Sequence, residues 1–168
     1  LATSSAASDV YKRQFPDKLR AYNRYAEGVN FVDTQNVASI IKGEIYPDSY
    51  LIITGHLDHV GINGDEVYNG ADDNGSGTVS ILEIAQAFQE AVEDGVRPKR
   101  SVVFLHVSGE EEGLLGSEYY VNNSLYPLED TFATLNLDMI GRTDPNRGYE
   151  DEEYIYSIGS CLLYTSPS

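Results

Sequence analysis

Residues 101–117 read SVVFLHVSGEEEGLLGS, an apolar run that passes directly into three consecutive glutamates. A continuous apolar run of this kind is typical of a strand that is buried on both faces of a parallel or mixed sheet. Three negative charges directly after a buried strand are unfavourable unless cations or water neutralise them. The stretch therefore predicts a central strand that ends at either a metal site or a solvated loop.

Predicted strands and helices alternate on both sides of this central strand. Apolar and β-branched runs predict strands over residues 36–42, 50–54, 131–137 and 154–158, with a turn at 46–49. The strand over 131–137 is expected to be buried. Apolar residues at helical spacing predict helices over residues 15–27, 78–93 and 115–121. This order predicts a single α/β domain with a mixed, largely parallel central sheet flanked by helices.

Four short motifs with histidine or acidic residues lie where these predicted strands end or where a helix begins. They are GHLD at residues 55–58, GADDNGSG at 70–77, EEEGLLGS at 110–117 and NLDM at 136–139. In open α/β sheets, ligands bind outside the carboxyl ends of the strands. Imidazole nitrogens and carboxylate oxygens suit zinc at a catalytic site, where one position stays open for water. Together the four motifs predict a two-metal hydrolytic site.

Each motif also has a structural interpretation when it is taken alone. His56 and Asp58 are spaced as a ligand and the carboxylate that orients it, although a lone histidine is more often a structural hydrogen-bonding group. One carboxylate of Asp72 and Asp73 could bridge two cations, or the pair could cap the following helix. Asp138 lies between apolar neighbours at a strand end, which favours a paired or metal-bound carboxylate.

The remaining histidines and the other acidic run have simpler interpretations. His59 is expected in a loop and His106 in the buried strand, both as structural residues. The acidic run at residues 150–153 is expected to be a solvated loop.

Composition excludes several classes of partner. The 168 residues include 11 Lys and Arg against 27 Asp and Glu, a formal net charge of -16 that repels nucleic acid and anionic membrane surfaces. No apolar run approaches the roughly 20 residues of a membrane-spanning helix. The single cysteine, Cys161, leaves no disulfide framework.

The two ends of the chain are related through one DNA string. Residues 9–14 can be back-translated as GATGTGTATAAGAGACAG, and the reverse complement of that string, read one base along, encodes residues 161–166. The string resembles a transposon end used in sequencing-library adaptors. We therefore expect residues 1–14 and 161–168 to be translated adaptor, and residues 15–160 to be a piece of a longer protein.

The four motifs, in this order, resemble those of the zinc-dependent aminopeptidases of metallopeptidase family twenty-eight. The resemblance extends over residues 34–142 and implies a zinc exopeptidase-like fold, which is expected to be incomplete at its C-terminal side. It implies a first zinc bound by His56 and Asp138, and a second zinc that shares Asp72 and is also bound by Glu111. The family also supplies a final histidine to the second zinc, and no histidine follows Asp138 here.

The same resemblance assigns the two remaining site residues. The family pattern Glu-Glu-x-Gly-Leu-x-Gly-Ser aligns with residues 110–117 and makes Glu110 the general base, with Glu112 at the variable position. Asp58 is implied as the partner that orients His56.

The activity implied by the resemblance is hydrolysis of peptides or proteins from their N-termini, with two zinc ions activating a water. A secreted or periplasmic protein is favoured by the same resemblance. Alternatives are a carboxypeptidase of the same family, a single-zinc glutaminyl cyclase and a non-catalytic binding ectodomain. His56 argues against the cyclase, and the retained ligand types argue against the ectodomain. Without the final histidine, the present chain is expected to hydrolyse little by itself.

Overall fold

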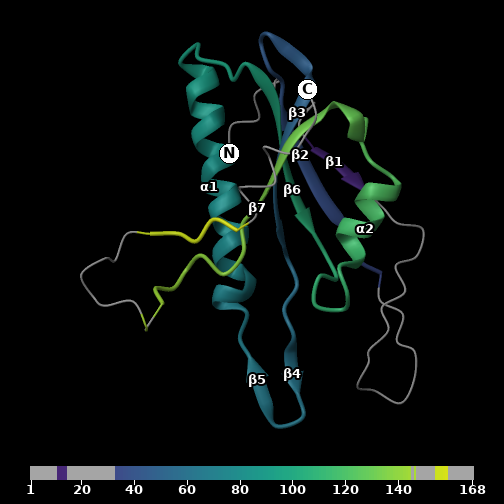
Figure 1. Cartoon of the computed structure of the whole chain (residues 1–168), viewed down its shortest axis with the longest axis vertical. Coiled ribbons are helices and arrows are strands. Elements are labelled where there is room, and N and C mark those ends of the chain that lie inside the picture. The colour runs from purple at the N-terminus through teal and green to yellow at the C-terminus, as the bar shows by residue number, and fades with distance from the viewer. Residues whose placement is uncertain (1–10, 15–32, 145, 147–153, 159–168) are drawn as a thin grey trace.

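A five-stranded mixed sheet lies at the centre of the structure (Figure 1). The computed structural model describes residues 11–14, 33–144, 146 and 154–158. The strands, in the spatial order β1-β2-β6-β3-β7, are β1 (Tyr11–Gln14), β2 (Asn36–Ile41), β6 (Arg100–Val107), β3 (Tyr46–His56) and β7 (Thr131–Asn136). β3 pairs with β6 and β7 in parallel, whereas β2 pairs with β1 and β6 antiparallel. The predicted mixed α/β class is confirmed.

The apolar run of the sequence forms β6, in the middle of the sheet. Every residue from Ser101 to Val107 is buried. Because successive side chains of a strand point to opposite faces, Val103 and Leu105 join one apolar cluster and Val102 and Phe104 join another. A strand with a hydrophobic cluster on each face accounts for a run without polar alternation.

Among the described residues, two α-helices cover opposite faces of the sheet (Figure 1). α1 (Gly77–Glu93) buries Ile81 against one face and places the ring of Phe88 5.9 Å from that of Phe104. α2 (Leu115–Asn122) contributes Tyr120 to the cluster on the other face. Both helices begin and end within one residue of the predicted bounds. Neither has the length and apolar character that crossing a bilayer requires.

Three predicted segments differ from the structure. Residues 46–49 are the first part of β3 rather than a turn, and the register with β6 shifts there. β7 is mostly exposed, because among the described strands it lies at the edge of the sheet with β3 as its neighbour. Residues 154–158 have no regular secondary structure. The predicted helix over 15–27 lies outside the described residues.

Two further strands form a hairpin that projects from the body of the structure (Figure 1). β4 (Gly61–Asn63) and β5 (Glu66–Tyr68) are joined by Gly64 and Asp65. Gly64 has a φ of 62°, which favours glycine, and a two-residue loop with glycine is the sequence signal that could have predicted this hairpin. The hairpin connects the end of β3 to the turn before α1. At the other side of the sheet, β1 falls in the segment expected to be translated adaptor and pairs with β2 at the outer edge.

Candidate metal centre

The predicted site residues gather at the carboxyl ends of three strands. His56 is the last residue of β3, Glu110 follows β6 and Asp138 follows β7. A fourth contribution comes from the turn over Ala71–Ser76, which leads into α1. Chain segments that are far apart in the sequence therefore meet at the edge where open α/β sheets bind ligands.

His56 is 2% exposed and its two ring nitrogens have different surroundings. Nδ1 lies 2.9 Å from the backbone oxygen of Asp58. Because a carbonyl only accepts hydrogen bonds, Nδ1 carries the hydrogen and donates it. Nε2 then presents a lone pair, and this buried atom has no hydrogen-bond partner among the described residues.

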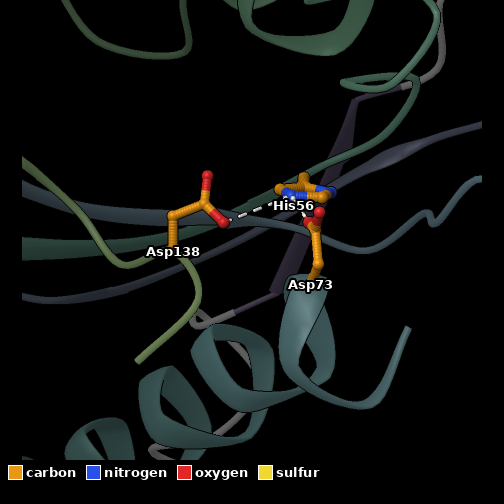
Figure 2. A group of neighbouring side chains, drawn as sticks. All are labelled: His56, Asp73 and Asp138. Atoms are coloured by element: carbon orange, nitrogen blue, oxygen red, sulfur yellow. Dashed lines mark ion pairs between the residues drawn. The ribbon is translucent and has the colours of Figure 1, made fainter. Parts of the chain in front are cut away.

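Three carboxylates face that unpartnered nitrogen. From Nε2, the distance is 3.2 Å to Asp73 Oδ1, 3.7 Å to Asp138 Oδ1 and 3.9 Å to Glu110 Oε2. Figure 2 shows the side chains of Asp73 and Asp138 directed toward His56. Ligand atoms of His56, Asp73 and Asp138 lie within 4.8 Å of one another.

This donor set fits a cation. A lone pair and negatively charged oxygens repel one another, and either a metal ion or a proton placed between them would relieve the repulsion. Imidazole nitrogen and carboxylate oxygen are zinc ligands, and three protein ligands leave a fourth position for water. The arrangement of His56, Asp73 and Asp138 therefore has the chemistry of a catalytic zinc site.

The structure separates the two adjacent aspartates and corrects the prediction for Asp72. The Asp72 side chain is 7% exposed and its carboxylate accepts a hydrogen bond from the Gly141 amide at 2.9 Å and pairs with Arg142 Nε at 3.0 Å. Asp73 instead faces His56. The reason is local: Asp73 has φ -102° and ψ 93°, outside the helical region, so the two neighbouring side chains point to different sides of the turn. The peptide bond after Asp73 is cis.

Asp58 has a wider role than the predicted one. Its backbone oxygen, rather than its carboxylate, is the hydrogen-bond partner of His56, since the carboxylate Oδ1 lies 3.7 Å from Nδ1. The carboxylate accepts hydrogen bonds from the backbone amides of Glu110 at 3.1 Å and Glu111 at 3.2 Å. Asp58 thus connects the segment after β3 to the segment after β6.

The local environment changes the acidity of both glutamates. Burial raises the pKa of Glu110, the charges of Asp138, Asp58 and Asp73 raise it further, and His56 opposes the shift. Burial also raises the pKa of Glu111, and the charge of Asp73 adds to this effect. Glu111 is not in the compact group of three ligands.

The other two histidines lie outside the group. His106 is buried in β6 with Nε2 3.2 Å from the backbone oxygen of Thr78, and burial lowers its pKa. His59 is exposed and its ring lies where a Cβ atom on Gly70 would be. The structural interpretation of His106 fits this position. The acidic run at 150–153 lies outside the described residues.

The fold and the donor set define a metal-binding α/β protein with the ligand types of a hydrolase. Residues 36–160 match peptidase family M28, and the chain belongs to this family. It is 34% identical over 115 residues to probable glutamate carboxypeptidase VP8 of Zea mays, which covers 68% of this chain and 15% of that protein. It is 42% identical over 105 residues to leupeptin-inactivating enzyme 1 of Streptomyces exfoliatus, which covers 61% of this chain and 22% of that protein.

The chain also resembles solved structures. The chain is similar to BSAP, a zinc aminopeptidase from Bacillus subtilis, with a TM-score of 0.52 and 33% identity. The match covers 64% of this chain and 25% of that one. The chain thus spans a quarter or less of the length of each of these three proteins.

Proposed function

We propose that this chain carries the zinc site of a peptidase that removes residues from the N-terminus of peptides. One observation carries the proposal: the buried Nε2 of His56 has no hydrogen-bond partner among the described residues and faces the carboxylates of Asp73, Asp138 and Glu110. Membership of peptidase family M28 gives this donor set a chemical context.

The geometry supports three of the proposed ligands, and one of these three differs from the sequence-based set. His56 and Asp138 would hold the first zinc, and Asp73 takes the bridging role that was predicted for Asp72. A carboxylate has two oxygens, so the second oxygen of Asp73 is free for another ion. Glu111 would bind the second zinc. The burial of Asp72 and its pairing with Arg142 leave it no part in either site.

Zinc ions bound here supply Lewis acidity, which polarises the scissile carbonyl and lowers the pKa of a water. Glu110 accepts a proton from the attacking water and delivers it to the leaving amine. Its raised pKa suits this role, because a general base works best when its pKa approaches the operating pH. Asp58 holds the amides of Glu110 and Glu111 and so fixes both carboxyl groups relative to His56.

The acidic surroundings of the site favour a substrate with a positive group. Asp58, Asp73, Asp138, Glu110 and Glu111 carry five formal negative charges against the four positive charges of a zinc pair, and the chain as a whole has a formal charge of -16. A free α-amino group is attracted by such a field, whereas the α-carboxylate of a C-terminus is repelled. The N-terminal residue is therefore the proposed cleavage site.

The test compares the rates at which the zinc-loaded protein hydrolyses leucine p-nitroanilide and its N-acetyl form. The protein is used at the full length that its host expresses. We expect hydrolysis of the free amine only. Glu110→Gln should lower turnover by about 100-fold or more while zinc remains bound. Glu112→Gln, at an exposed position two residues away, is the matched control and should keep full turnover.

Three outcomes would contradict the proposal. Unchanged turnover in Glu110→Gln would remove the assigned base. Cleavage of substrates from the carboxyl end would indicate a carboxypeptidase. Cyclisation of an N-terminal glutamine without hydrolysis would indicate a glutaminyl cyclase.

A further inference from the structure

Asn74 binds the backbone on both sides of Asp138. It is 2% exposed, and its Nδ2 donates a hydrogen bond to the Leu137 oxygen at 2.9 Å. Its Oδ1 accepts from the Gly77 amide at 3.0 Å and, more weakly, from the Met139 amide at 3.4 Å. One side chain of the turn thus contacts the residues directly before and after a proposed zinc ligand.

Two more side chains of the same turn bind the same segment. The Ser76 hydroxyl donates to the backbone oxygen of Asp72 at 2.7 Å and accepts from the Ile140 amide at 3.1 Å. The Asp72 carboxylate accepts from the Gly141 amide at 2.9 Å. We call Asp72, Asn74 and Ser76 the clamp. These are alternate residues of the turn, and Asp73 lies between two of them on the side of His56.

The clamp and its target are closely packed. A Cβ atom on Gly77 would lie 2.3 Å from the Leu137 oxygen, and one on Gly141 would lie 2.9 Å from Asp72 Oδ1. Both distances are shorter than real Cβ contacts allow. The two glycines therefore allow the turn and the segment that carries Asp138 to approach more closely than residues with side chains would permit.

The backbone directly after Asp138 adopts a conformation that needs support. Met139 has a φ of 48°, in the left-handed region that residues with a side chain rarely occupy. Its side chain is 53% exposed, so burial of that side chain does not account for the conformation. A strained backbone persists where its surroundings determine it, and here the clamp accepts hydrogen bonds from the amides of residues 139, 140 and 141.

We infer that Asn74 is a positioning residue, which together with Ser76 holds Asp138 at the zinc-binding distance from Asp73 before the ion binds. This inference rests on the proposed function only in taking Asp138 as a zinc ligand. Asp73 belongs to the turn and Asp138 to the segment that the turn binds, so the clamp sets the separation of the two carboxylates. A preorganised ligand pair binds an ion more tightly, because less freedom is lost on binding.

The experiment measures zinc affinity of the full chain by competition with a chromophoric chelator, in wild type, Asn74→Ala and Asn122→Ala. Asn122 is exposed and donates to a carbonyl of its own helix, which makes its variant the matched control. We expect Asn74→Ala to weaken zinc binding by about 10- to 100-fold, the usual effect of losing a group that orients a ligand. The control should bind like wild type.

Cobalt substitution separates positioning from general stability. The visible absorption of bound Co²⁺ reports the coordination geometry, and we expect Asn74→Ala to change its intensity while the control leaves it unaltered. Circular dichroism without metal checks that each variant is folded. If Asn74→Ala does not fold, Ser76→Ala removes the bonds of this hydroxyl to the Ile140 amide and to Asp72, keeps those of Asn74, and should show a smaller change of the same kind.

The possible results distinguish this inference from the proposed function. A wild-type chain that binds no zinc overturns the proposed function. Wild-type affinity and an unchanged cobalt spectrum in folded Asn74→Ala overturn the inference and leave the proposed function intact. The same result in Ser76→Ala has the same meaning where Asn74→Ala is unfolded.

Discussion

At the scale of single residues, the adjacent Asp72 and Asp73 in the turn before α1 have different roles. Asp72 is buried against Gly141 and Arg142, whereas Asp73, half-buried, lies 3.2 Å from His56. Removing the first carboxylate leaves the Gly141 amide without its acceptor. Removing the second leaves the fold intact and takes away an acidic ligand.

We expect Asp72→Ala and Asp73→Ala to affect different properties, the first the stability of the fold and the second the binding of zinc. Asp72→Ala should lower the free energy of unfolding by about 2–3 kcal/mol, because a hydrogen bond and a charge pair are lost from a buried carboxylate. Asp73→Ala should unfold like wild type without metal but lose zinc binding. Urea denaturation in EDTA and zinc titration measure the two quantities. Tight zinc binding in Asp73→Ala would refute the assignment of this residue.

At the scale of elements, α1 is held on the sheet by polar as well as apolar contacts. His106 projects from β6 to the same face as Phe104 and lies 3.2 Å from the Thr78 oxygen in the first turn of α1. Because that carbonyl accepts, the Nε2 atom of a neutral ring donates. Burial lowers the pKa of His106 below its ordinary value of 6.5, and the bond to Thr78 opposes this shift.

This lowered pKa predicts a dependence of stability on pH. Between the folded-state pKa and 6.5 the unfolded chain binds more protons at His106 than the folded chain does, so this contribution to stability is complete above about pH 6.5 and is lost as the pH falls. We expect His106→Gln to lack this contribution, and His59→Gln, at an exposed position, to retain it. Urea unfolding at several pH values from about 5 to 8 measures the difference. A constant difference between wild type and His106→Gln over that range would disprove the prediction.

At the scale of the whole molecule, the proposed zinc site joins the turn before α1 to the ends of two neighbouring strands of the sheet, β3 and β7. The end of β3, the turn before α1 and the segment after β7 each contribute one ligand. A metal ion at this point would link them, and binding to the folded state alone stabilises that state.

Zinc should therefore raise the melting temperature of the chain. At a free zinc concentration of about 100 times the dissociation constant, the gain is about 2.7 kcal/mol, which corresponds to roughly 5–10 °C for a chain of this size. Calorimetry in zinc and in EDTA measures this shift. His56→Ala should melt at the same temperature in both, and an equal shift in that variant would place the ion elsewhere.

The amino-acid sequence by itself determined the parts of the protein that depend on local pattern. The unbroken apolar run identified β6 as a strand covered on both faces, and helical spacing identified α1 and α2. Motif order placed His56, Glu110 and Asp138 at or directly after strand ends, where the structure has them. These features follow from residue type and period alone.

Only the tertiary structure decided which aspartate faces the histidine, what the Asp58 carboxylate binds and how Asp138 is held. Asp72 and Asp73 have the same chemistry and are adjacent, so no pattern distinguishes them. Their directions depend on the backbone angles of an irregular turn. This turn forms hydrogen bonds with partners that are separated from it by 63 to 69 positions in the sequence. The exposure of β7 likewise depends on its place at the edge of the sheet. The physical reason is the same in each case. Contacts between segments that are distant in sequence orient these groups, and local sequence preferences carry no information about such contacts.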